Sequence, residues 1–374
     1  MRILSFTITN PYDWCLKIFL LFCPIIWLPG FTQNNLQMMI FNYGAVLLFG
    51  IGIILPKQRE FKNYNLFLLL LLSMIVTIFR NPTQLRIGFL NIVFACLLYY
   101  SIVTNVKDIK EISKIFIWLF WINFIVLIFQ LFNFNLVYKE SVLCGLMAKS
   151  NHLAIFLAII APILFMQSWL YLILIGVILL LLQCYSALLA FVITVILLII
   201  NRVKNKRIVF AIIGGLGLGS IPLIIKLFGV YWYKIATRLS AWQFLLKESF
   251  INPLIGKGIG SFRLETEINN IVLGNMPVVL SYNEYFNFMY EFGLLFSGIF
   301  FVSMFLYYKR LTPEGCSFNP LFLSIISILV VCFFQDPLHI TRLAVPIITI
   351  LALFEASCSA NKKEVLNVVN TNKI

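Results

Sequence analysis

The sequence predicts an all-α polytopic membrane protein with about twelve transmembrane helices and one large external loop that contains an interfacial helix. Hydrophobic residues make up 61% of the 374 residues and charged residues only 11%, and the mean hydropathy is +0.99. A soluble domain carries about a quarter charged residues, so a soluble fold is excluded. Long apolar runs alternate with short polar joints, and the basic residues gather in those joints, as in a multi-pass membrane protein.

The predicted spans follow the apolar runs. A helix needs roughly twenty apolar residues to cross the hydrocarbon layer, and somewhat fewer where its ends are anchored. On this measure we expect spans near 14–29, 36–55, 64–80, 85–103, 114–132, 152–167, 169–184, 186–200, 207–228, 286–308, 320–335 and 340–357. The close pair at 169–184 and 186–200 is also compatible with one broken span. No internal repeat is visible, so 1–374 is treated as a single membrane domain.

The distribution of basic residues predicts the orientation, because cytoplasmic joints retain lysine and arginine. With the N-terminus inside, the cytoplasmic joints are PKQREFKN, NVKDIKEISK, NRVKNKR, YYKR and the NKKE segment, and they hold most of the basic residues. The loop 229–285 then lies on the external side of the membrane. Residues 358–374 form a cytoplasmic tail. The first apolar run lacks a convincing cleavage site and is expected to be retained as a span.

Composition also limits the partners. The chain has 28 Lys+Arg against 14 Asp+Glu, a net charge of +14. These basic residues form neither a continuous basic face nor a stacking platform, so nucleic-acid binding is not expected. The eight cysteines are scattered, and none forms Cys-x-x-Cys or lies at metal-ligand spacing. We therefore predict no metal and no cofactor.

The stretch 231–293 is too polar and too interrupted to cross a bilayer, which makes it the candidate site. Within it, residues 234–249 place apolar side chains at helical spacing, and Asn252-Pro253 ends that pattern. Arg238 and Trp242 are four residues apart and therefore share one side of the predicted helix. We expect this helix to lie along the outer membrane interface.

A glycine-rich segment follows, in which Gly256, Gly258 and Gly260 alternate with other residues. Its amides could cradle an anion, with Lys257 and Arg263 adding positive charge, although a structural turn explains the glycines equally well. A dinucleotide or phosphate-binding loop would need a preceding strand. The apolar surroundings predict none, so these two classes are excluded.

Two carboxylates follow the loop, Glu284 at the entrance of a predicted span and Glu291 inside it. A carboxylate about two turns inside a span is costly unless it is paired or faces water. Glu291 is therefore a site residue or a buried pairing group. The polar sequence Asp336-Pro-Leu-His339-Ile-Thr-Arg342 also falls on the predicted external side, and its charged residues are either interfacial anchors or phosphate contacts.

Several segments match one family in order. They are Lys149-Ser-Asn151-His-Leu-Ala154, Cys184-Tyr185-Ser-Ala-Leu-Leu-Ala190, Arg238-x-x-x-Trp242, Pro253-Leu-x-Gly256-x-Gly258-x-Gly260-x-Phe262, and Asn283-Glu284-Tyr285 followed by Glu291-x-Gly293. Together these segments resemble the O-antigen ligase / O-antigen polymerase family. The resemblance covers roughly 149–298, and the predicted layout of twelve spans with one large external loop agrees with it.

The resemblance implies a metal-independent, inverting glycosyltransferase of the bacterial inner membrane, with its site on the external face. Its donor would be a glycan linked to undecaprenyl diphosphate, and its acceptor a glycan or lipid hydroxyl. A chain-length regulator and a flippase are the implied protein partners. Arginine suits the diphosphate because its fork matches phosphate oxygens. The candidate donor-binding residues are Arg238, Arg263, Lys257, Gly256, Gly258, Gly260, Asn283, Trp242, Lys149 and Arg342.

The chain departs from the family at two positions. The family's proposed general base is a histidine where this chain has Tyr282, and its mid-chain arginine corresponds here to Tyr185. A phenol with a pKa of about 10 is a poor base at neutral pH. Either Glu284, Glu265 or Glu267 takes the base role, or the site differs, or activity is lost. The catalytic candidates are Glu284 and Tyr282, and the further candidates are Tyr185, Glu291 and Asn151.

Three functions remain open. The first is a polymerase that lengthens a lipid-linked O-antigen or capsule chain. The second is a ligase that moves the finished glycan to a lipid A core or a protein, which differs only in its acceptor. The third is a transporter or flippase of the lipid-linked unit, which would favour inverted repeats and charges deep in the membrane. The charges here gather in one loop instead, which favours the enzyme.

Overall fold

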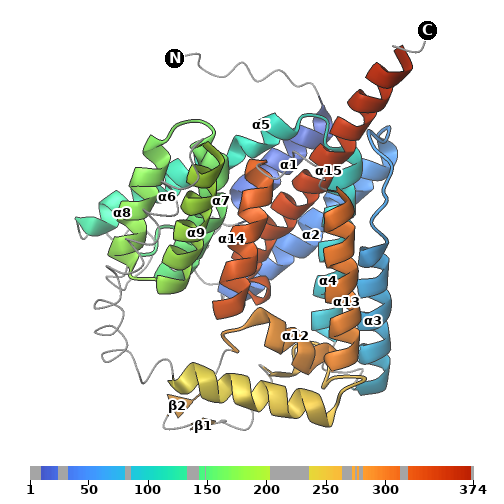
Figure 1. Cartoon of the computed structure of the whole chain (residues 1–374), viewed down its shortest axis with the longest axis vertical. Helices are drawn as coiled ribbons and strands as arrows, with labels where there is room; N and C mark the ends of the chain where they lie inside the picture. Colours follow the sequence, from blue (N-terminus) through green and yellow to red (C-terminus); the bar gives the residue numbers. More distant parts are fainter. Residues whose placement is uncertain are drawn as a thin grey trace.

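The computed structural model describes residues 10–23, 33–80, 86–132, 143–147, 149–202, 236–262, 272–273, 276–277, 281–311 and 319–371. Almost all of them are helical (Figure 1). The elements are α1 (Pro11–Phe22), α2 (Gln33–Ile54), α3 (Tyr64–Arg80), α4 (Arg86–Asn105), α5 (Ile109–Ser113), α6 (Ile115–Leu131), α7 (Ser150–Phe165), α8 (Leu170–Leu182), α9 (Tyr185–Arg202), a helix at 236–251, β1 (Val272–Leu273), β2 (Met276–Pro277), α12 (Glu284–Phe292), α13 (Leu294–Leu311), α14 (Pro320–Phe334), the 3₁₀ turn η1 (Pro337–His339) and α15 (Thr341–Thr371). The two short strands pair antiparallel.

The prediction of an all-helical, apolar fold is confirmed. Four of the described helical stretches are long and apolar enough to cross a membrane, namely Gly88–Asn105, Ile109–Leu131, Leu294–Leu311 and Thr341–Ala360. Shorter apolar helices occupy most of the other predicted spans, and the predicted span 207–228 lies outside the described residues. The pair at 169–184 and 186–200 forms two helices, because Gln183 adopts a left-handed conformation that ends α8.

The expected span 286–308 differs from the structure. It is divided into the nine-residue α12 and the longer α13 by Gly293, which has φ +89°. A Cβ at this glycine would lie 2.7 Å from the carbonyl oxygen of Leu254, so the loop before α12 passes too close for any other residue. The segment expected to be a tail, 358–374, continues α15 as far as Thr371.

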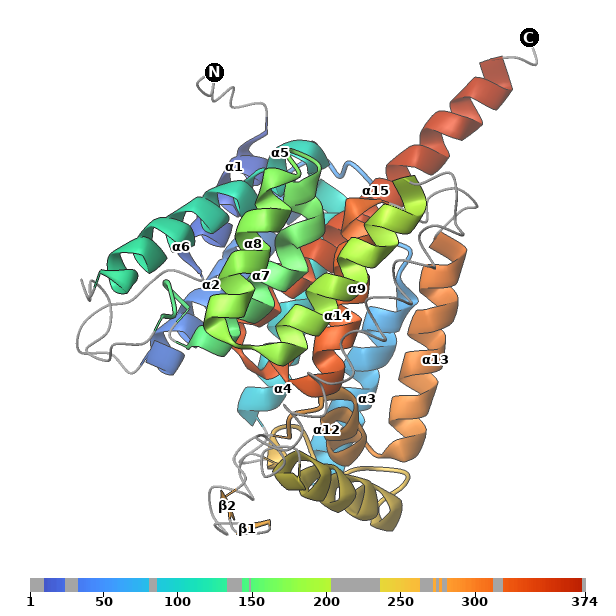
Figure 2. The ribbon, with the colours of Figure 1, turned by 60° about the vertical axis from the view of Figure 1, so that its left-hand side comes forward.

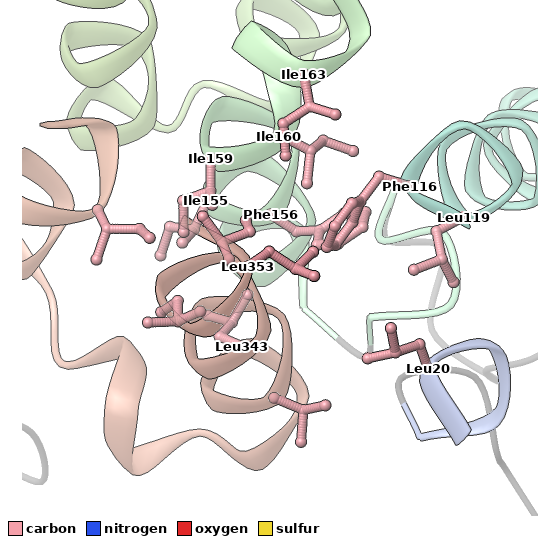
Figure 3. Close-up of a cluster of buried hydrophobic side chains, with 14 of the residues drawn as sticks. Leu20, Phe116, Leu119, Ile155, Phe156, Ile159, Ile160, Ile163, Leu343 and Leu353 are labelled. Atoms are coloured by element: carbon pink, nitrogen blue, oxygen red, sulfur yellow. The ribbon is translucent and has the colours of Figure 1, made fainter. Parts of the chain in front are cut away.

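The core of the bundle is formed by α7 and α15. Twelve of the sixteen residues of α7 are buried, and 72% of the stretch Thr341–Ala360 is buried inside the protein. Figure 3 shows Phe156 of α7 close to Leu353 of α15, with Phe116 of α6 beside them. Buried alanines along α7 allow close approach, and Ser327 of α14 donates a hydrogen bond of 2.9 Å to the Ala158 carbonyl. Small residues and hydroxyl bonds are the usual means of packing helices in a membrane.

Polar contacts gather at the two opposite ends of the bundle. At one end the amides of Gln58 and Arg59 donate to the carbonyl of Thr104. At the other end, Arg80 donates from Nη2 to Asn252 Oδ1 at 2.8 Å and to the Ile255 carbonyl at 2.9 Å. Figures 1 and 2 show the 236–251 helix, in yellow, lying across the end of the bundle away from α5. The described joints 56–63 and 105–114, which are predicted to be cytoplasmic, therefore lie at the end of the bundle opposite to the 236–251 helix.

Candidate functional site

Four segments that are distant in sequence meet between the end of the bundle and the 236–251 helix. Arg238 of that helix places its guanidinium carbon 5.0 Å from the centre of the Tyr282 ring. Burial lowers the pKa of Arg238, and the charges of Tyr282, Cys184 and Asp336 act in the opposite direction, which shows that all three lie close to it. The segments around Cys184 and Tyr282, which carry part of the family resemblance, and the turn after α14 thus surround Arg238.

Aromatic packing holds the 236–251 helix in place. Ala241 and Leu245 are fully buried and contact Phe262 and Tyr290. On the neighbouring side, the Trp242 ring lies 5.7 Å from both Phe286 and Phe333, in an edge-to-face arrangement. Trp242 is therefore a packing residue between this helix, α12 and α14 rather than a free stacking platform for a sugar.

Asn283 sets the start of α12. Its Oδ1 accepts a hydrogen bond from the Phe286 amide at 3.0 Å, and its Nδ2 donates to the Phe333 carbonyl at 2.9 Å. The first bond is an N-cap, which satisfies an amide that has no partner within the helix. The second ties α12 to the end of α14. The predicted donor-binding residue Asn283 is thus a structural residue that fixes the helix bearing Glu284.

The glycine-rich segment closes the other end of α12. The Lys257 amide donates to the Tyr290 carbonyl at 2.8 Å, and the Gly258 amide donates to the Glu291 carbonyl at 3.0 Å. A Cβ at Gly256 would lie 2.4 Å from the Tyr290 carbonyl oxygen, so glycine is required there. The segment is therefore a structural turn that caps the last carbonyls of α12.

This turn favours the structural explanation of the glycines. The amides of Lys257 and Gly258 are bonded to α12, so they cannot cradle an anion without releasing that helix. The Lys257 side chain also makes an ion pair, because its Nζ lies 2.9 Å from Glu248. Gly260 adopts φ +78° beyond these bonds. The predicted contacts of Arg263 and the alternative bases Glu265 and Glu267 lie outside the described residues.

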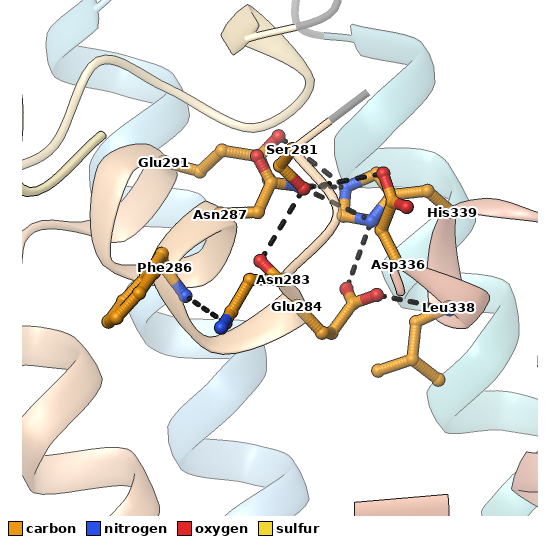
Figure 4. Close-up of polar contacts among 9 residues, drawn as sticks. All are labelled: Ser281, Asn283, Glu284, Phe286, Asn287, Glu291, Asp336, Leu338 and His339. Atoms are coloured by element: carbon orange, nitrogen blue, oxygen red, sulfur yellow. Dashed lines mark hydrogen bonds and ion pairs between the residues drawn. The ribbon is translucent and has the colours of Figure 1, made fainter. Parts of the chain in front are cut away.

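A cluster of acidic and imidazole groups lies at the centre of the site (Figure 4). Glu284, Asn287 and Glu291 follow one another at helical spacing along one side of α12 and point toward His339 of η1. His339 Nδ1 lies 2.9 Å from Glu284 Oε1, and Nε2 lies 3.5 Å from Glu291 Oε1. The second oxygen of Glu284 accepts the Leu338 amide at 3.2 Å.

The charges of this cluster shift its ionisation. Burial by itself lowers the pKa of His339, but Glu284 and Glu291 outweigh burial and hold that pKa well above 6.5. Asp336 lies behind the imidazole, where it accepts a bond of 3.3 Å from the Ser281 hydroxyl. Burial and the charge of Glu284 raise the pKa of Asp336 to about 6. Near neutral pH the cluster therefore holds an imidazolium between carboxylates.

Sequence reasoning did not select His339 as a site residue, because it left the charged residues of this turn as either interfacial anchors or phosphate contacts. It is one of only two histidines in the chain, and it lies in a polar turn between two apolar runs. These two features are the signal that could have found it. The cluster can accept or release a proton at the imidazole. Among the described residues, no group of three or more His, Cys, Asp or Glu side chains is placed to hold a metal ion.

The remaining candidates lie apart from this cluster. Arg342 is buried at the start of α15 and acts electrostatically on Cys144, so it faces the 143–147 segment. Lys149 and Asn151 are exposed at the start of α7. Tyr185 is 46% exposed at the first position of α9, although its neighbour Ser186 accepts a bond of 3.5 Å from Gln335. The turn before α9 therefore borders the site, and Tyr185 itself is half-exposed.

Comparison with known proteins adds no assignment. No protein-family model matches the chain, and no curated protein matches it.

Proposed function

We propose that this chain is a membrane glycosyltransferase that uses an undecaprenyl-diphosphate-linked glycan and polymerises the repeat units of a bacterial surface polysaccharide. The observation that carries this proposal is spatial. Three of the segments that resemble the O-antigen ligase / O-antigen polymerase family, at 238–242, 253–262 and 283–293, meet in the fold, because Arg238 contacts Tyr282 and the Gly256 turn caps α12 at Glu291. Unrelated chance matches would have no reason to be adjacent in the fold.

The proposed membrane arrangement has twelve spans with the site on the external face. Two features support it. The described basic joints 56–63 and 105–114 lie at the end of the bundle opposite to the 236–251 helix, as the positive-inside rule requires of an external loop. The helix bundle also exposes many large apolar side chains to its surroundings, among them Phe67, Phe79, Trp118 and Phe305. Such a surface fits lipid rather than water.

The charge at the site fits a lipid diphosphate. Arg238 is only partly buried and lies over Tyr282, next to the acid and imidazole cluster. A guanidinium here can neutralise the diphosphate as it leaves. The apolar helices beside the site offer the polyprenyl chain a path into the membrane. In this proposal Arg238 holds the donor and the α12–η1 cluster faces the acceptor.

The test is glycan length in a deletion strain that carries variants of this protein. Arg238→Ala is expected to leave insertion intact and reduce the glycan to single repeat units. Lys247→Ala, which removes an exposed charge from the same helix, is the matched control and is expected to support normal length. Normal glycan in the Arg238→Ala strain would reject the diphosphate contact.

The deletion strain itself separates the alternatives. Single-repeat glycan indicates a lost polymerase. Accumulated lipid-linked polymer indicates a lost ligase instead. Lipid-linked single units retained on the cytoplasmic leaflet indicate a transporter. Either of the last two results would overturn the proposed polymerase.

A further inference from the structure

His339 is the accessible member of the acid and imidazole cluster. Its side chain is 35% exposed, whereas those of Glu284 and Glu291 are 7% and 3% exposed. Glu284 also has both oxygens engaged, one by the imidazole and one by the Leu338 amide. A substrate hydroxyl arriving at this face therefore meets the imidazole before it meets either carboxylate.

The Nε2 atom of His339 has two polar neighbours, Asn287 and Glu291. Asn287 Nδ2 lies 3.0 Å from Nε2 and 3.4 Å from Nδ1. A group in line with the Nε2 lone pair would be much farther from Nδ1, so the amide lies over the face of the ring. Glu291 is 3.5 Å from Nε2, which is longer than a normal N–H···O hydrogen bond. The contact of Nδ1 with Glu284, at 2.9 Å, is the shorter of the two carboxylate contacts of the imidazole.

This arrangement is a carboxylate–imidazole dyad. The carboxylate fixes one ring nitrogen and stabilises the imidazolium that forms when the other nitrogen takes a proton. The imidazole is supported from two helices, because η1 carries it and α12 carries the carboxylates. The carboxylates are held by α12, which is capped by Asn283 and bonded to the end of α14.

We propose that His339 is the proton acceptor for the acceptor hydroxyl and that Glu284 is the carboxylate that positions it; this inference rests on the proposed glycosyl transfer. In the step, the hydroxyl oxygen bonds to the anomeric carbon of the donor sugar. The bond from that carbon to the diphosphate breaks, and its electron pair leaves with the phosphate oxygen. The hydroxyl proton passes to Nε2 of His339.

The other candidate base residues are less suitable. Tyr282 is a phenol whose ring lies against the Arg238 guanidinium, in the left-handed conformation with φ +52°. Glu291 is buried and faces the imidazole rather than the surface. His339 therefore supplies, from the turn before α15, the imidazole that the family places where this chain has Tyr282.

The charged groups around His339 predict a distinctive pH profile. Glu284 and Glu291 face it from α12, and Asp336 faces it from its own turn. All three favour the imidazolium, so the base form is populated only as the pH rises above the pKa of His339. Transfer should accelerate with rising pH. Glu284→Gln removes the nearest negative charge and should shift the rising limb to lower pH while lowering the maximal rate.

The dyad can be measured without activity. Purified protein in detergent, labelled with ¹⁵N-histidine, contains only the two imidazoles of His152 and His339. His152→Gln assigns the signals. The His339 signal is expected to titrate above 6.5 and to move to lower pH in Glu284→Gln. A His339 signal that titrates at or below 6.5 and does not respond to Glu284→Gln would overturn the dyad, whatever the protein catalyses.

The catalytic role is tested by transfer in vitro with an undecaprenyl-diphosphate-linked repeat unit. His339→Gln should slow transfer by roughly 100-fold or more, the usual contribution of a general base, while donor binding and the elution profile are retained. His152→Gln is expected to remain near wild type. Transfer by His339→Gln within a few-fold of wild type would overturn the proposal. If His339→Gln does not fold, an unshifted pH profile in Glu284→Gln overturns it instead. Failure of wild type to transfer rejects the glycosyltransferase and leaves the dyad to the titration.

Discussion

Gly256→Ala tests whether the glycine-rich turn holds the C-terminal end of α12 in place. The added Cβ would lie 2.4 Å from the Tyr290 carbonyl oxygen and 2.5 Å from the carbonyl carbon and oxygen of Glu291. All three are backbone atoms, so no flexible side chain can move aside. The turn or the end of α12 must shift, and the hydrogen bonds from the amides of Lys257 and Gly258 would lengthen or break.

The magnitude follows from those contacts. Two lost backbone hydrogen bonds cost about 1 kcal/mol each, and overpacking a closely packed site costs about 1–3 kcal/mol. We therefore expect the free energy of unfolding to fall by roughly 3–5 kcal/mol. Glu291 is at the C-terminal end of α12, which this turn caps, so its distance to His339 should change as well. Transfer should decrease even where the protein remains folded.

The assay uses the chain's own thiols. Six of the described cysteines are buried (Cys23, Cys96, Cys144, Cys184, Cys332 and Cys358), so a thiol-reactive dye reports unfolding in detergent. The matched control is Gly298→Ala in α13, where nothing lies within 4 Å of the added Cβ. That variant should be neutral or slightly stabilised, since alanine favours a helix over glycine by about 1 kcal/mol. Equal melting and equal transfer in Gly256→Ala and Gly298→Ala would show that the glycine-rich turn does not hold α12.

Three further predictions concern the same end of the bundle. Asp336→Asn should raise the free energy of unfolding by about 2–3 kcal/mol at pH 8, because the folded protein holds the pKa of Asp336 at about 6, above its ordinary value, and ionising the buried carboxylate is costly. Because the pKa is raised, the stability that Asp336 contributes is largest at low pH and is lost as the pH rises through 6, so the stability gained by Asp336→Asn should vanish near pH 4. Thermal unfolding followed with the thiol-reactive dye at several pH values checks this, and an equal gain at pH 4 and pH 8 contradicts it. Asn283→Ala should destabilise by about 1–3 kcal/mol through loss of the α12 cap and of the bond to Phe333, whereas Asn283→Ser should recover the cap alone; identical melting of the two variants argues against the cap, and a serine variant as stable as wild type argues against the bond to Phe333. Arg80→Ala should leave the bundle intact but expose 252–262 to external protease, because Arg80 holds Asn252 and Ile255; unchanged cleavage would show that these bonds do not anchor the loop.

The sequence was sufficient for the helical fold because the signal is strong and local. Apolar runs bounded by charged joints predicted helices close to the observed positions, and α3 has the predicted bounds 64–80. The prediction was wrong where a contact distant in sequence decides the structure. Nothing within 286–308 indicates a break, because the break at Gly293 is imposed by the carbonyl of Leu254 in the preceding loop.

The candidate site shows the same limit. Glu284 and Arg238 could be selected from the sequence as polar residues in an apolar chain, and the structure places them at the same end of the bundle. The partner of Glu284 could not, since His339 is more than fifty residues away in a segment that resembles no motif. The bonds from the Lys257 and Gly258 amides to α12 could not be predicted either, because sequence spacing does not show which carbonyls lie nearby.

The burial of α15 has a consequence for how the protein is made. This helix packs against α2, α4, α7, α13 and α14, and it is far more buried than α13, of which only 11% of the spanning stretch is buried. Its Glu355 accepts a hydrogen bond of 2.9 Å from Asn63, a residue synthesised almost three hundred positions earlier. The ribosome therefore delivers the central helix after the helices that surround it. The contacts of the central helix can form only after the helices around it have been made, and His339 can reach Glu284 only once the turn before α15 has been synthesised.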